Sequence, residues 1–193
     1  MITACSLSRS FGEKEVLRDV DLDVPRGGFL LVTGRNGSGK STLLRLFAGL
    51  LAPTGGVLTV EAARSAIGYV GHEPLVYREL TALENLDLYG RLYRIPERRE
   101  RCGALLERYG LWRVRSEQAG TFSRGMLQRL ALCRALLHDP DLLLFDEPFA
   151  GLDAEGEALL TQELAEGRER TAIVATHDPE ALAPLATARL ALA

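Results

Sequence analysis

A glycine-rich stretch near the N-terminus has the residue types and spacing needed to hold phosphate groups. Residues 34–41 read Gly-Arg-Asn-Gly-Ser-Gly-Lys-Ser, which fits the pattern G-x-x-x-x-G-K-[ST]. Glycines let the backbone turn so that successive N–H groups point at phosphate oxygens, while Lys40 adds a positive charge and the Ser41 hydroxyl can ligate Mg²⁺. A plain glycine-rich turn at a helix start would explain neither the lysine nor the hydroxyl. The predicted nucleotide-phosphate residues are Gly34, Arg35, Asn36, Gly37, Ser38, Gly39, Lys40, Ser41 and Thr42.

Two adjacent acids, Asp146 and Glu147, can serve the same phosphate chemistry. They end an apolar run, where a carboxylate can hold Mg²⁺ directly or through water. We expect Asp146 to hold the metal and Glu147 to orient and partly deprotonate the attacking water. Taken alone, the pair could equally be a solvated turn before Pro148, but the phosphate loop favours the catalytic interpretation.

Three apolar runs have the character of buried parallel strands that position these groups. They cover residues 28–33, 141–146 and 171–176, and each is followed by polar residues. Ligands of open α/β sheets gather at the carboxyl ends of the strands, so residue 34 onward, Asp146 with Glu147, and His177 should converge. Residues 20–24 alternate apolar and acidic side chains, which predicts an antiparallel edge strand.

Length and composition indicate one domain with an inserted helical part. The chain has 193 residues, 47% of them hydrophobic and 25% charged, as in an ordinary globular protein. Residues 72–136 are mostly helix-compatible, including an apolar helix expected at 127–137. We expect a single domain over 1–193, with a core of residues 1–71 and 137–193 and a helical subdomain at about 72–136. The three scattered cysteines are expected to be reduced and structural.

A stretch shortly before the predicted strand at 141–146 indicates which class of phosphate-binding enzyme this is. Residues 122–126, Phe-Ser-Arg-Gly-Met, resemble the signature motif of ABC ATPases, usually written LSGGQ, with matches at Ser123 and Gly125. Ser123 can cap the following helix and Gly125 allows close approach, although a plain helix cap would look the same in isolation. The resemblance implies that Ser123, Arg124, Gly125 and Met126 meet the ATP held by a second subunit.

Other segments resemble the same family in the same order along the chain. Phe11 stands where the family has an aromatic ring that stacks on adenine, and Asp153 where it has a loop that communicates across the dimer. His177 resembles the switch histidine that contacts the terminal phosphate. The resemblance covers essentially the whole chain and implies an α/β P-loop NTPase fold of the ABC ATPase type, with an antiparallel β edge. It also implies Mg²⁺-dependent ATP hydrolysis, with Glu147, His177 and Lys40 as catalytic residues, in a homodimer whose isolated subunit is a poor ATPase.

One departure from the family pattern points to a subgroup. His72 stands where the family normally has a glutamine that ligates Mg²⁺ and senses the membrane partner, so metal candidates are Ser41, Asp146 and additionally His72. Residues 71–72 and 79–86 resemble the ATP-binding subunit of the haem exporter of cytochrome c maturation. Exporters of drugs, lipids or polysaccharides remain alternatives. Residues 77–93 are a candidate docking groove for membrane subunits, or an ordinary helical surface.

Charge and hydropathy bear on the partners. The net charge of −3 gives no general attraction to nucleic acid, so an ABC-type ATPase acting on DNA or ribosomes is the weaker alternative and no nucleic-acid partner is expected. No apolar run reaches the roughly 20 residues of a spanning helix, and no leader pattern is visible. We therefore expect a peripheral protein at the cytoplasmic face of the cell membrane, held there by integral membrane permease subunits.

Overall fold

Two sheets form the framework of the computed structural model, which describes residues 1–167 and 169–192. One sheet is antiparallel, with the order β2-β1-β4, and the other is parallel, with the order β5-β6-β7-β3-β8. The strands are β1 (Ile2–Phe11), β2 (Lys14–Val24), β3 (Phe29–Gly34), β4 (Gly55–Val60), β5 (Ile67–Val70), β6 (Leu142–Asp146), β7 (Thr171–Ala175) and β8 (Ala188–Leu192). The helices are α1 (Lys40–Phe47), α2 (Ala82–Leu92), α3 (Arg98–Arg108), α4 (Arg124–Leu136) and α5 (Ala154–Glu166).

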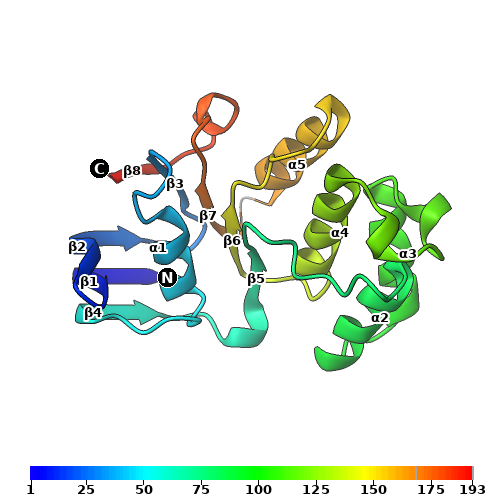
Figure 1. Ribbon diagram of the computed structural model, residues 1–193, viewed down its shortest axis with the longest axis horizontal. Coiled ribbons are helices and arrows are strands. Elements are labelled where there is room, and N and C mark those ends of the chain that lie inside the picture. Colours follow the sequence, from blue (N-terminus) through cyan, green and yellow to red (C-terminus); the bar gives the residue numbers. More distant parts are fainter. Residues whose placement is uncertain (168, 193) are drawn as a thin grey trace.

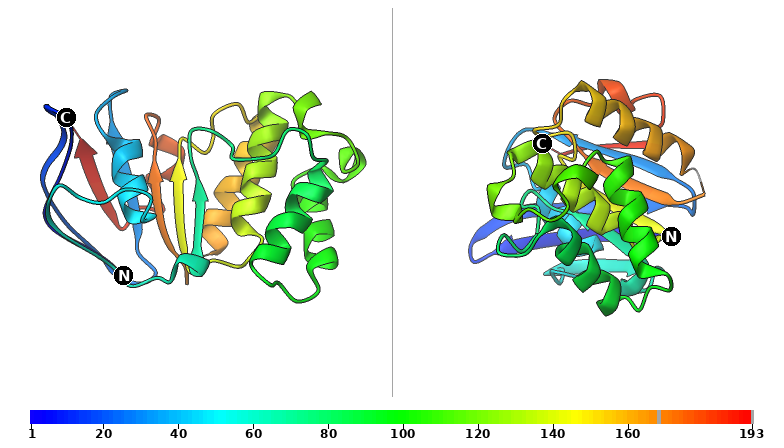
Figure 2. Two further views of the ribbon diagram at one scale, coloured as in Figure 1. Left: turned by 60° about the horizontal axis from the view of Figure 1, so that its bottom comes forward. Right: turned by 90° about the vertical axis from the view of Figure 1, so that its right-hand side faces the viewer.

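The helices cover the parallel sheet on both faces and extend beyond one edge. Helix α1 lies between the two sheets, while α2, α3 and α4 gather beyond the β5 edge (Figures 1 and 2). Strands β6 and β7 are buried throughout, as the uninterrupted apolar runs predict. The three predicted parallel strands are thus confirmed as β3, β6 and β7, and the predicted antiparallel edge lies in β2.

Alternating side chains of the parallel strands divide the core into two clusters. Leu30 and Val32 of β3 pack with Leu43 and Phe47 of α1 on the face toward the antiparallel sheet. Leu31 points to the opposite face, in a cluster that continues through β6 and α5 into helices α2, α3 and α4. The helical part is therefore packed directly against the parallel sheet whose β6 strand ends in Asp146.

Several elements lack a clear sequence pattern and were not anticipated. Strands β4 and β8 lie at sheet edges with mixed exposure, and β5 has only four residues. Strand β1 has three register shifts against β2, which disturb any regular alternation. The helix expected at 127–137 is α4, and it begins three residues earlier because Ser123 caps it.

Two of the three cysteines lie in the core. Cys102 and Cys133 are buried in the core as free thiols, whereas Cys5 is exposed and so lies outside the core where structural cysteines were expected. Within residues 1–167 and 169–192, no helix is both long enough and apolar enough to cross a membrane.

Candidate functional site

The phosphate loop joins β3 to α1 and opens onto the carboxyl edge of the parallel sheet. Gly39 caps α1 with φ of 101°, a left-handed conformation that favours glycine, and a Cβ there would lie 2.8 Å from Leu17 Cδ2. The first turn of α1 contains no acidic residue, so the positive end of its dipole remains available to an anion. The local chain is therefore shaped for phosphate.

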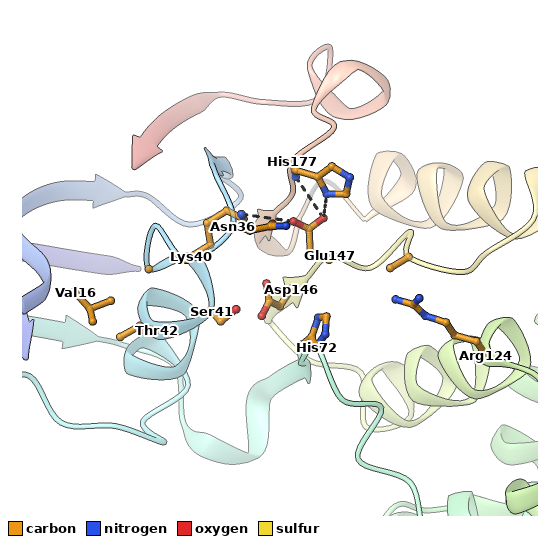
Figure 3. Close-up of a pocket in the computed structure, with 13 residues that line it drawn as sticks. Val16, Asn36, Lys40, Ser41, Thr42, His72, Arg124, Asp146, Glu147 and His177 are labelled. Atoms are coloured by element: carbon orange, nitrogen blue, oxygen red, sulfur yellow. Dashed lines mark hydrogen bonds and ion pairs between the residues drawn. The ribbon is translucent and has the colours of Figure 1, made fainter. Parts of the chain in front are cut away.

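Lys40 is the cation of this loop and it is almost entirely buried. Its Nζ donates hydrogen bonds to the carbonyl oxygens of Gly34 (2.8 Å) and Arg35 (3.3 Å). The same Nζ lies 3.7 Å from Oε1 of Glu147. The ammonium group is thus oriented by its own loop and faces the acidic pair at the end of β6 (Figure 3).

Glu147 links the end of β6 to β7 and to the phosphate loop. Its backbone N–H donates to the carbonyl of Ala175 in β7 (2.8 Å), and its Oε2 lies 2.8 Å from Nδ1 of His177. Its φ of 49° is unusual for a residue with a side chain, a strain of about 1–3 kcal/mol that such sites often hold. The carboxylate therefore stands between Lys40 on one side and His177 on the other.

Asp146 is deeper in the site than Glu147. Burial raises the pKa of the Asp146 carboxyl above its ordinary value, and hydrogen bonding by the Ser41 hydroxyl partly offsets this rise. A bound divalent cation would stabilise the ionised form. Among the described residues, Asp146 Oδ2, Glu147 Oε1 and Ser38 Oγ are buried without a hydrogen-bond partner. Such orphaned oxygens fit a site for Mg²⁺ and phosphate, because Mg²⁺ prefers oxygen ligands. No cluster of three or more His, Cys, Asp or Glu with metal-binding geometry occurs in 1–167 and 169–192.

Most of the predicted phosphate and metal residues line one cavity of about 480 Å³, and Gly34, Arg35 and Ser38 are not part of its lining. It is bounded by Val16, Asn36, Gly37, Gly39, Lys40, Ser41, Thr42, His72, Arg124, Asp146, Glu147, Ala150 and His177. The structure therefore brings together the phosphate loop, the two acids and both predicted histidines (Figure 3). Sequence reasoning did not single out Val16, since an apolar residue on β2 carries no chemical signal.

Other predicted residues lie outside this cavity. Phe11 ends β1 with 46% of its surface exposed. Ser123 accepts a hydrogen bond from Met126 N–H (3.2 Å) and so caps α4, with Gly125 in the first turn. Asp153 caps α5 through Gly156 N–H and forms an ion pair with Arg129. The structure therefore places these residues outside the lining of the Lys40 cavity.

The start of α4 is fastened to the segment that follows Glu147. Gln128 Nε2 donates to the carbonyl of Pro148 (2.9 Å). A Cβ on Gly125 would lie 2.5 Å from the carbonyl oxygen of Gly151, a separation shorter than real contacts. The signature-like stretch and the acidic pair are therefore held in a fixed relation within one chain.

Comparison with known proteins identifies the family. A family profile described as "ABC transporter" matches residues 17–150. The chain is 41% identical to the ABC transporter ATP-binding protein NatA of Bacillus subtilis, over 79% of this chain and 69% of NatA. It is 39% identical to an aliphatic sulfonates import ATP-binding protein, SsuB of Rhodopseudomonas palustris, over 89% of this chain and 63% of that protein.

A solved structure agrees with these relatives. The fold matches a dimeric post-hydrolysis state of the ATP-binding cassette MJ0796 bound to ADP and Pi, with a TM-score of 0.82 and 30% identity over 94% of this chain and 90% of that one. The chain belongs to the ABC transporter family, and its class is that of the ATP-binding ABC ATPases. The expected ABC-type P-loop fold is thereby confirmed.

Proposed function

We propose that the chain binds Mg²⁺-ATP at the cavity around Lys40 and hydrolyses it to power membrane subunits. The observation that carries this proposal is the convergence of Lys40, Asp146, Glu147 and His177 from separate elements on one cavity. Residues 34–42 hold the phosphates through backbone N–H groups and Lys40. Ser41 and Asp146, with His72 as an additional candidate, hold Mg²⁺, which would supply charge neutralisation at the phosphates.

Glu147 is the proposed general base, and His177 its partner at the terminal phosphate. The 2.8 Å contact between Oε2 of Glu147 and Nδ1 of His177 orients the carboxylate. Lys40, 3.7 Å away from the other carboxylate oxygen, is positioned to stabilise charge on the leaving phosphates.

A second subunit completes the site in this proposal. ABC cassettes form dimers, and the compared cassette structure is dimeric. Ser123, Arg124, Gly125 and Met126 would reach the ATP of the opposite subunit, with Asp153 at the dimer contact. The helix start at Ser123, whose N–H groups favour an anion, supports that role. Arg124 also borders the Lys40 cavity of its own chain.

Gly125→Ala is expected to lower ATPase turnover about tenfold to hundredfold. The added Cβ would collide with the backbone carbonyl of Gly151 and force the start of α4 away from residues 150–153. Steady-state phosphate release, measured beside ATP affinity, checks this. Gly103→Ala is the matched control, because a Cβ there meets Trp112 at an ordinary 3.5 Å. Wild-type turnover in Gly125→Ala would contradict the proposed role of this close approach.

We further propose an exporter, with haem export for cytochrome c maturation as the candidate transport. The resemblance of residues 71–72 and 79–86 to that subgroup supports it. Exporters of drugs, lipids or polysaccharides are alternatives. One named relative is an importer of sulfonates, so import is an alternative direction of transport. Residues 72–136 would form the helical subdomain that docks on permease subunits at the cytoplasmic face of the membrane. Exposed Leu75 and Tyr77, with 48% and 51% of their surfaces accessible, lie within it and suit a protein contact.

Purification of the tagged chain from detergent-solubilised membranes of its source cells tests this proposal. An integral membrane protein should copurify, and its loss in a Leu75→Glu, Tyr77→Glu variant should accompany normal ATP binding. Leu50→Glu, at an exposed leucine outside the helical segment, is the control. Haem-dependent stimulation of ATPase in the complex supports haem export. Copurification with a permease that responds to another compound would contradict the haem assignment.

A further inference from the structure

Phe11 is held by an arginine on the same strand. The guanidinium carbon of Arg9 lies 4.5 Å from the centroid of the Phe11 ring, within the range of a cation–π contact. A register shift between Arg9 and Ser10 interrupts the regular alternation of β1, and the contact itself shows that the two side chains lie together. One face of the ring is therefore covered by a cation, while 46% of the Phe11 surface remains exposed.

The arginine is itself anchored to the phosphate-binding half of the molecule. Its Nη1 donates a hydrogen bond of 2.9 Å to the carbonyl of Ala52, in the connection that follows α1. Its Nε is buried and has no hydrogen-bond acceptor within the described part of the chain. The electron-rich ring face is thus an important electrostatic partner for the rest of the guanidinium.

Hydrogen bonds join the end of β1 to the segment that follows α1. Helix α1 begins at Lys40, in the phosphate loop, and the segment after its end carries Ala52. Thr54 in the same segment accepts a hydrogen bond from Ser10 N–H (3.0 Å), next to Phe11. The tip of β1 is therefore tied by Arg9 and Ser10 to the segment that continues from the phosphate-binding helix.

We propose that Arg9 is a positioning residue for the nucleotide base, acting through Phe11. It covers one ring face, fixes the ring relative to α1, and leaves the other face for adenine to stack on. A ring already held in place loses less conformational freedom when the base arrives, so stacking stabilises the complex more. This inference rests on the proposed ATP binding and on the role that the family resemblance implies for Phe11, that of receiving the base. It goes beyond that function by assigning base affinity to a residue that need not contact the nucleotide.

The test compares ATP with inorganic tripolyphosphate, which has the phosphates but no base. Dissociation constants for both are measured by titration calorimetry in Mg²⁺ with the full chain. Arg9→Met removes the charge and the bond to Ala52 while keeping an apolar side chain of similar length. We expect it to raise the Kd of ATP about three- to tenfold, and to leave the Kd of tripolyphosphate unchanged.

Two further variants distinguish the possible outcomes. In a Phe11→Ala background, Arg9→Met should have no additional effect on the Kd of ATP, because Arg9 acts through the ring. Arg18→Met removes the same charge from an exposed position of the same sheet and should change neither constant. Unchanged binding of tripolyphosphate by the Arg9→Met variant also shows that this variant is folded.

Each contrary result has a separate meaning. An equal rise for ATP and tripolyphosphate, an unchanged ATP Kd, or tighter ATP binding by Arg9→Met overturns the positioning role. An additive loss in the Phe11→Ala background also overturns it, because Arg9 would then act on the nucleotide without the ring. If Phe11→Ala itself leaves the ratio of the two constants unchanged, the stacking of adenine on Phe11 that the family resemblance implies fails instead.

Discussion

Glu147→Gln is expected to lower ATPase turnover about a hundredfold or more while ATP binding persists. The amide keeps the size of the side chain, so it can remain between Lys40 and His177, but it cannot accept a proton from water. The phosphate loop and Lys40 are unchanged, and the mutant dimer should stay closed on ATP. Phosphate release, nucleotide titration and gel filtration in ATP measure the three effects.

The control for this variant is Glu155→Gln in the exposed first turn of α5, which changes the same charge outside the cavity. It should turn over ATP at the wild-type rate. Undiminished turnover in Glu147→Gln would remove the general-base assignment. Loss of ATP binding together with turnover would show that Glu147 instead maintains the shape of the site.

Lys40→Ala is expected to weaken ATP binding itself, by about tenfold to a hundredfold. Charge-assisted hydrogen bonds to phosphate contribute about 1.5–3 kcal/mol, and the buried ammonium group is already oriented by Gly34 and Arg35. Removing it also removes the ammonium group that lies 3.7 Å from Oε1 of Glu147, so turnover should fall as well. Titration calorimetry with ATP checks the affinity.

Lys40→Met separates charge from packing in this experiment. The Lys40 side chain is buried, so alanine also leaves a small void, whereas methionine fills it. Equal losses in both variants assign the effect to the ammonium group. Wild-type affinity in Lys40→Met would show that the charge does not hold the nucleotide.

The amino-acid sequence by itself predicted the buried parallel strands and the phosphate loop, because each is a short contiguous pattern. Buried strands β6 and β7 are uninterrupted apolar runs with no polar alternation, and the phosphate loop is a contiguous motif between a strand and a helix. Strands β5 and β8 were missed, because one is very short and the other is a half-exposed edge. Their position follows from pairing with β6 and β3, which is a property of the assembled sheet.

In the candidate site, too, some features were predicted from the sequence and others appeared only in the tertiary structure. The amino-acid sequence by itself identified Lys40, Asp146 and Glu147, since their chemistry is tied to contiguous motifs at strand ends. Only the tertiary structure determined that Glu147 lies between Lys40 and His177 and that Arg9 covers Phe11 and reaches Ala52. The physical reason is that distances between residues far apart in sequence depend on how strands pair and helices pack. A linear pattern does not specify these distances.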